Sequence, residues 1–177
     1  MSKVIGALEI AANIAIVLIA ALLVGLSLGW IGPARAPGQP AWVQVGDQIL
    51  IDGADWKDQL PQVVVVFGSQ CHFCREGGDF YSKLLGLADQ HVIGLTFVAN
   101  RGDAHATRSA LKEMGLGVAL VAEADFGKNR FYGTPILLLT DATKKVRQVW
   151  RGRLAADAEA AALAAITGRV ARRPIRQ

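Results

Sequence analysis

The chain has 177 residues, of which 52% are hydrophobic and 19% are charged, and its formal net charge is +4. It has only two cysteines, which stand within four residues of each other. A disulfide that closes so short a loop contributes little stability, so stabilisation of the fold is not the expected role of this pair. Part of the positive charge lies in residues 169–177, which predict a basic tail that is either solvated or in contact with acidic lipid headgroups.

Residues 10–30 form the longest apolar segment of the chain. Asn13 and Ser27 are its only polar residues, and a helix of this length can cross a bilayer. We therefore predict a transmembrane signal-anchor over residues 1–31, with residues 10–30 in the lipid bilayer. Two alternatives stay open, namely a signal peptide that is cleaved near Ala34-Arg35-Ala36 and a buried hairpin.

A linker and an extended segment are predicted to follow the anchor. Three prolines within residues 32–41 favour a stiff, extended spacer. Residues 42–51 alternate loosely between polar and apolar side chains around the turn signal Gly46-Asp47, and this pattern predicts an N-terminal β-hairpin. The main domain is predicted to span residues 42–168.

A buried strand and a helix are predicted around the two cysteines. Residues 63–67 are all valine or phenylalanine, which is typical of a strand that is buried on both faces. Residues 71–87 predict a helix with a weak point at Gly77-Gly78. The sequence Cys71-His72-Phe73-Cys74 begins this helix.

The two cysteines are expected to differ in reactivity. Side chains three residues apart are neighbours on a helix, so one disulfide can form and break with little backbone movement. Free N–H groups at a helix N-terminus favour an anion, so we expect a lowered pKa for Cys71, which makes it the nucleophile. Cys74 should face the core, be less accessible and act as the resolving thiol. Redox exchange is the chemistry that this spacing favours.

Strands and helices alternate through the rest of the chain. We predict a strand at residues 92–98, a helix at 104–114 with Asp103 as its N-cap, a strand at 117–122, a short helix or irregular segment at 124–132, a hairpin of strands 136–140 and 146–151, and a closing helix at 155–167 that ends at Gly168. This order predicts an α/β fold with a mixed sheet between helices.

Thr134 and Pro135 stand directly before the predicted strand 136–140. Proline cannot donate a hydrogen bond to a strand ladder, so it belongs at the start of a strand. The Thr134–Pro135 bond is also the one bond of the chain with a structural reason to be cis.

An apolar strand, Cys71-His72-Phe73-Cys74 on a helix, and Gly133-Thr134-Pro135 before a hairpin together resemble the thioredoxin superfamily. Within it, residues 42–168 are most similar to membrane-anchored, extracytoplasmic proteins of the TlpA/ResA type. The predicted helix at 104–114 and the strand that follows it resemble the helix–strand insert of that type. The resemblance implies a thioredoxin-like fold, with a mixed central sheet flanked by helices.

The resemblance also implies roles for four residues. Cys71 attacks, Cys74 resolves, and a cis-proline loop formed by Thr134-Pro135 holds the substrate backbone. From the motif itself, Phe73 is expected either in an apolar lip that meets the substrate or packed on the helix. His72 either faces solvent or stabilises the Cys71 thiolate and makes the couple more oxidising.

The chain departs from the family pattern at three places. Gln70 stands where a tryptophan usually precedes the first cysteine, and residues 63–66 lack the buried acid of many thioredoxins. Gly77-Gly78 replaces a proline that is frequent in the helix. A metal site is disfavoured because a structural zinc site needs four ligands, and we expect neither a metal nor a dissociable cofactor.

These features predict a membrane-tethered thiol–disulfide oxidoreductase that acts on substrate protein disulfides or thiols. Disulfide exchange suits an oxidising compartment. We therefore place the chain in the inner membrane as a single-pass protein, with its domain in the periplasm. There it would meet a membrane or periplasmic redox partner, and we expect no nucleic acid as a partner. The alternative is a non-catalytic, thioredoxin-like client-binding protein that uses the disulfide of Cys71 and Cys74 as a switch.

Overall fold

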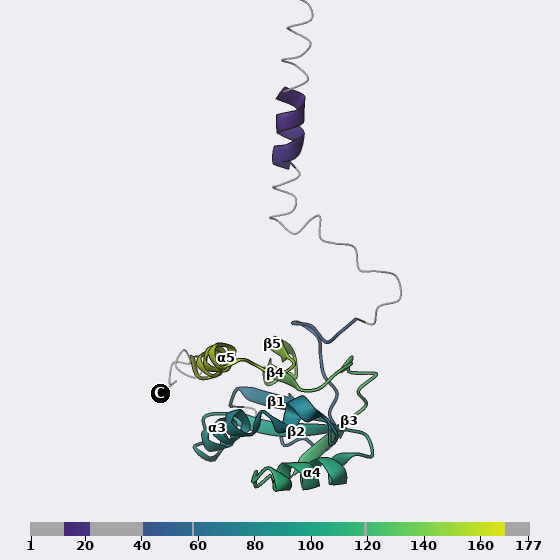
Figure 1. Cartoon of the computed structure of the whole chain (residues 1–177), viewed down its shortest axis with the longest axis vertical. Coiled ribbons are helices and arrows are strands. Elements are labelled where there is room, and N and C mark those ends of the chain that lie inside the picture. The colour runs from purple at the N-terminus through teal and green to yellow at the C-terminus, as the bar shows by residue number, and fades with distance from the viewer. Residues whose placement is uncertain (1–12, 22–40, 58, 119, 169–177) are drawn as a thin grey trace, which may run out of the picture. The chain divides into compact units, whose positions relative to one another are not determined.

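A computed structural model of the chain describes residues 13–21 and 41–168, except residues 58 and 119 (Figure 1). The chain divides into two compact units, residues 1–39 and 40–177.

In the first unit, residues 13–21 form a helix inside the predicted transmembrane segment. The other residues of 10–30, the linker up to residue 40 and the basic tail 169–177 lie outside the described residues. Among the residues that are described, no helix has both the length and the hydropathy that a membrane crossing requires. Membrane insertion and the domain boundaries therefore stay predictions.

The described part of the second unit is built on a five-stranded mixed sheet. Its strands are β1 (Gln62–Val66), β2 (Gly94–Asn100), β3 (Val121–Ala124), β4 (Ile136–Thr140) and β5 (Val146–Arg151). They lie in the order β3-β2-β1-β4-β5. Strands β3, β2 and β1 are parallel, and β4 is antiparallel to both of its neighbours, β1 and β5. The predicted mixed sheet with a final antiparallel pair is confirmed.

The helices of residues 41–168 are α2 (His72–Arg75), α3 (Gly78–Asp89), α4 (Ala104–Glu113) and α5 (Ala156–Gly168). Leu84 of α3, Leu111 of α4 and Ile166 of α5 join one buried cluster with Val63 and Val65 of β1. Since side chains alternate along a strand, all three long helices cover the same face of the sheet.

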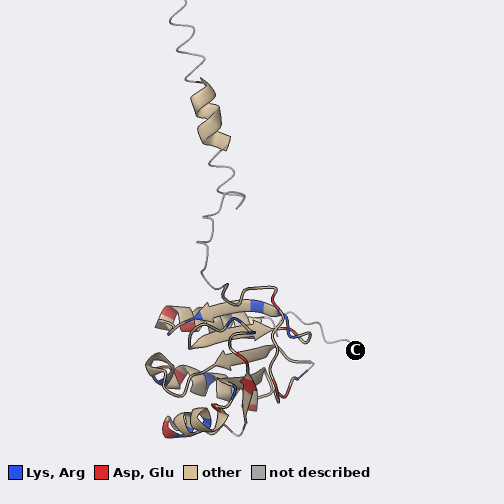
Figure 2. Ribbon diagram, turned by 90° about the vertical axis from the view of Figure 1, so that its right-hand side faces the viewer, with Lys and Arg blue, Asp and Glu red and all other residues tan. Residues whose placement is uncertain are grey.

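The opposite face of the sheet, onto which Val64 and Val66 point, is covered by segments outside the helices. Val43, Ile49 and Phe131 pack there in a second buried cluster. Figure 2 shows the helices on one side of the sheet and loops on the other. The predicted placement of the sheet between helices is therefore wrong for the described residues, because apolar residues of the loops cover the second face.

The helix predicted at residues 71–87 is divided into α2 and α3 at Glu76-Gly77. The ring of Tyr81 lies so close to Gly77 that a Cβ atom there would be 2.9 Å from Tyr81 Cζ. Phe67 and Phe97 hold this ring by edge-on contacts, with centroid distances of 6.1 and 5.8 Å. The predicted weak point is confirmed, and the packing of Tyr81 requires a glycine there.

The hairpin predicted at residues 42–51 is wrong. The turn at Gly46 is present, with Asp47 N donating to Gln44 O at 3.2 Å. The segment nevertheless pairs with the chain that leads into β5, through a bridge between Gln48 and Lys145. A pairing partner distant in sequence has therefore replaced the local one.

The strand predicted at residues 117–122 begins later, at Val121, and continues to Ala124. Parallel pairing explains the shift, because Val121 to Ala124 are the residues in register with Phe97 to Asn100 of β2. The strand therefore begins where its pairing with β2 begins.

We predict that Gly77→Ala destabilises the domain by about 1–3 kcal/mol, the usual cost of overpacking. Its φ of −84° suits alanine, so the loss comes from the collision with Tyr81. Gly86→Ala in α3, where a Cβ would meet nothing within 4 Å, should instead stabilise by about 0.5–1 kcal/mol. Urea unfolding measures both, and equal effects at the two glycines would contradict this packing argument.

Candidate active site

Cys71 and Cys74 form a disulfide at the start of α2. Cys71 is the N-cap of this helix, and its Sγ accepts a hydrogen bond from Cys74 N at 3.1 Å. Cys74 is completely buried, whereas Cys71 is partly exposed. The predicted difference in accessibility is confirmed, so an incoming sulfur atom can reach Cys71 and cannot reach Cys74.

The loop before β4 lies directly against Cys71. The Thr134–Pro135 peptide bond is cis, as predicted, and Thr134 O is 3.3 Å from Cys71 Sγ. Gly68 makes room for this approach, because a Cβ there would be 3.0 Å from Thr134 Oγ1 and 3.3 Å from Cys71 Cβ. A disulfide sulfur has no proton to donate, so this contact becomes a hydrogen bond only when Cys71 is a thiol.

Three ionisable side chains, His72, Glu76 and Arg153, contact one another in sequence beside the motif. His72 Nε2 is 3.0 Å from Glu76 Oε1, one helical turn later. Arg153, which follows β5, places Nη1 2.8 Å from the other carboxylate oxygen of Glu76. The His72 side chain is 78% exposed, which fits the prediction that it faces solvent. Its ring also pairs with Glu76, whose carboxylate is bound by Arg153.

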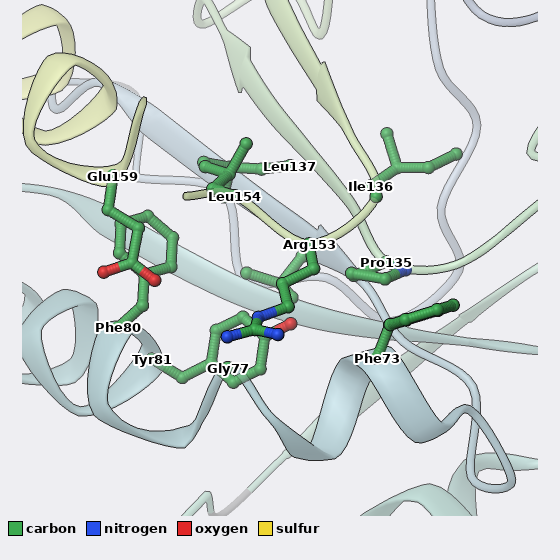
Figure 3. A pocket seen from close by; sticks show the side chains of 12 residues that line it. Phe73, Gly77, Phe80, Tyr81, Pro135, Ile136, Leu137, Arg153, Leu154 and Glu159 are labelled. Carbon is green, nitrogen blue, oxygen red and sulfur yellow. The ribbon is translucent and has the colours of Figure 1, made fainter. Parts of the chain in front are cut away.

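A small apolar recess lies on the Pro135 side of the motif (Figure 3). Phe73, Pro135 and Tyr81 line it, together with the side chains of Arg153 and Glu159. Phe73 is 56% exposed, as expected for an apolar lip. Burial, with a smaller contribution from the charge of Glu159, raises the pKa of Tyr81, so its phenol stays protonated near neutral pH.

A wider, solvent-open groove lies on the Thr134 side of the motif. Cys71 and residues 68–70 form one wall, residues 131–134 form another, and Asp103 also lines the groove. The predicted N-cap Asp103 does precede α4, but its side chain makes no capping bond to the helix backbone. Ser69 Oγ donates to Asp103 Oδ1 at 3.1 Å instead.

The six residues predicted for the site lie around one disulfide, and their catalytic and binding roles stay predictions. Sequence reasoning missed three charged residues near them, Glu76, Arg153 and the groove-facing Asp103. The spacing of His72 and Glu76 on one helix face was a readable signal, because residues four apart are neighbours. Arg153 comes from a distant part of the chain, and no local pattern marks it.

No protein-family profile and no curated protein matches the sequence. Among solved structures, the chain is similar to a candidate protein disulfide isomerase from Bacteroides thetaiotaomicron, with 17% identity and a TM-score of 0.53 over 74% of this chain and 92% of that one. It is also similar to a domain of a candidate thiol-disulfide isomerase from Cytophaga hutchinsonii, with 15% identity and a TM-score of 0.50 over 75% of this chain and 99% of that one. At such identities the similarity concerns the fold, and the predicted thioredoxin-like α/β fold is confirmed.

We predict that Glu76→Gln raises the reduction potential of the disulfide by about 5–20 mV, the equivalent of one exposed ion pair. Removal of a nearby negative charge favours negative charge on Cys71 Sγ in the reduced form. Titration against glutathione measures the potential. Asp79→Asn, which removes an exposed acid of α3 that has no ion pair within the described residues, should shift the potential less; an equal or negative shift for Glu76→Gln would contradict the prediction.

Proposed function

We propose that this protein is a thiol–disulfide oxidoreductase that exchanges the Cys71–Cys74 disulfide with cysteines of substrate proteins. One observation carries the proposal: a partly exposed Cys71 lies beside the Thr134 carbonyl, while its partner Cys74 is completely buried. This asymmetry suits a pair in which one sulfur meets the substrate and the other completes the reaction.

In the reducing direction, the Cys71 thiolate attacks one sulfur of a substrate disulfide, and the other substrate sulfur leaves as a thiolate. Cys74 then loses its proton and attacks Cys71 Sγ, so the remaining substrate sulfur leaves and the Cys71–Cys74 disulfide forms. Two electrons pass to the substrate, and the reverse direction uses the same atoms. The hydrogen bond from Cys74 N to Cys71 Sγ stabilises negative charge on the sulfur that attacks first.

The loop of Thr134 and Pro135 is the proposed binding strand for the substrate backbone. Within the described residues, the N–H of Thr134 makes no hydrogen bond to the protein, so it is available to an extended segment. Such a segment would add a short strand beside Cys71, a common mode of peptide recognition. Phe73, on the other side of the motif, would contact its apolar side chains.

The proposal extends to the place of action. We propose that residues 10–30 anchor the protein in the inner membrane and that the domain faces the periplasm, where a membrane or periplasmic redox partner renews the pair. The support is the apolar composition of residues 10–30 and the fit of disulfide exchange to an oxidising compartment.

We predict that Cys74→Ser traps substrates as mixed disulfides on Cys71, because the resolving attack is lost. Cys71→Ser should lower the turnover of a generic protein disulfide to the uncatalysed background. Non-reducing gel electrophoresis detects the trapped species, and insulin reduction measures turnover. If Cys71→Ser keeps its turnover, or if Cys74→Ser captures nothing, the enzymatic proposal fails in favour of a client-binding protein with a redox switch.

A further inference from the structure

The groove beside Cys71 and the apolar recess of Figure 3 lie on two sides of the same cis-proline loop. The groove is lined by Cys71 and Thr134, whereas the recess is lined by Phe73 and Pro135, and the two share no residue. A substrate strand that pairs with Thr134 therefore places some of its side chains in the groove. The chemistry of the groove then selects among substrates.

Asp103 carries the one formal charge among the residues that line the groove in the described part of the chain. Its carboxylate accepts hydrogen bonds from Ser69 Oγ at 3.1 Å and from Thr107 Oγ1 at 3.4 Å. Hydroxyl groups orient the carboxylate and leave its negative charge in place. Asp103 makes no ion pair within the described residues, so this charge is available to a ligand.

Two arginines close in sequence to groove residues each have an acidic partner, and Arg75 also donates from Nη2 to Ser69 O at 3.4 Å. Arg75 Nη1 is 3.0 Å from Glu113 Oε2, and Arg101 Nη2 is 2.8 Å from Asp52 Oδ2. Each cation is thus offset by an acid of its own. Among the described residues that line the groove, the one formal charge is therefore negative, although the chain as a whole has a formal net charge of +4.

Aromatic side chains also line the groove. Of Phe126, Phe131 and Tyr132, Phe131 is buried, whereas Tyr132 is 43% exposed and meets the ring of Trp42 edge-on at a centroid distance of 6.0 Å. Lysine and arginine side chains lay their apolar stems on such surfaces and are attracted to aromatic faces. An aromatic wall with a single carboxylate therefore suits a long cationic side chain.

From this juxtaposition we propose that the groove binds a polypeptide segment that carries a lysine or arginine within two residues of its reactive cysteine. The cation contacts Asp103 while the neighbouring sulfur meets Cys71. This inference rests on the proposed function and specifies the substrates that the site prefers. The spacing of two residues follows from Ser69, which is hydrogen-bonded to Asp103 and stands two residues before Cys71 in the same loop.

The preference should act on the reaction as well as on binding. The carboxylate of Asp103 disfavours negative charge on Cys71 and on the sulfur atoms of the exchange. A substrate cation that pairs with Asp103 offsets this repulsion. An acidic neighbour in the substrate adds to the repulsion, so the two kinds of substrate differ in kcat/KM.

The test uses pairs of disulfide-linked peptides that are identical except for lysine or glutamate beside the cysteine, placed in turn on either side of it. The protein is used as the full chain. We expect its kcat/KM for the better-placed lysine peptide to be about 3- to 10-fold higher than for the matching glutamate peptide at low salt. Asp103→Asn, which keeps oxygen and nitrogen atoms for Ser69 and Thr107, should remove most of this preference. Asp103→Lys should reverse it, and added salt should weaken it.

Glu113→Gln is the matched control, because Glu113 is an exposed acid on the same helix that is paired with Arg75 and does not line the groove. It should keep the lysine preference. Binding of peptides with serine in place of cysteine, followed by fluorescence anisotropy, reports on the groove even without turnover. Equal binding and equal turnover of the lysine and glutamate peptides, or a preference that Asp103→Asn leaves intact, would overturn the inference. If no peptide is turned over while the lysine preference in binding persists, the proposed function fails and the groove assignment stands.

Discussion

Val66 pairs with Ile136 in the antiparallel ladder between β1 and β4, and the whole site depends on this register. The chain that leaves β1 turns at Gly68 into the cysteine motif, while the chain that enters β4 arrives through Thr134 and Pro135. Because the two strands are antiparallel neighbours, the end of one lies beside the start of the other. Cys71 and Thr134, 63 residues apart in sequence, thus come within 3.3 Å of each other. A shift by one residue would turn the β1 side chains to the opposite faces of the sheet.

Two carboxylates near the cysteine motif have different surroundings. Glu76 pairs with both His72 and Arg153, so a guanidinium group lies beside its charge. Within the described residues, the Asp103 carboxylate is hydrogen-bonded to hydroxyl groups and forms no ion pair, and it lines the same groove as Cys71. Under the proposed groove assignment, the electrostatic potential at Cys71 would depend both on the protein and on the substrate, which would link redox reactivity to substrate choice.

Much of the site was predictable because its signals are local. The valine run of β1, the spacing of the two cysteines and the proline at the start of β4 each follow from rules that operate within a few residues. The errors come from contacts between distant segments. Residues 42–51 have the alternation of a hairpin, yet they pair with the chain before β5. The break before α3 was readable at Gly77, but its cause, the ring of Tyr81 held by Phe67 and Phe97, depends on the folded core. Asp103 was interpreted as a helix cap, and only the fold places it beside Cys71.

The burial of Cys74 orders the chemistry of the pair. In the proposed reaction, a substrate sulfur would reach Cys71 first, because Cys74 is covered by the core that β1 and α3 share. Cys74 nevertheless lies within disulfide distance, with a Cα–Cα separation of 5.2 Å from Cys71. The proposed resolving attack would therefore be intramolecular and need little movement, whereas attack by a second substrate would have to come from solvent. Such proximity gives an intramolecular nucleophile a large advantage over a diffusing one. The same burial excludes water from around Cys74, and β1 has no carboxylate that could take up a proton. In the proposed reaction, the position of Cys74 favours the resolving attack, so the release of substrate, rather than its capture, is the step that the surroundings of this buried sulfur would affect.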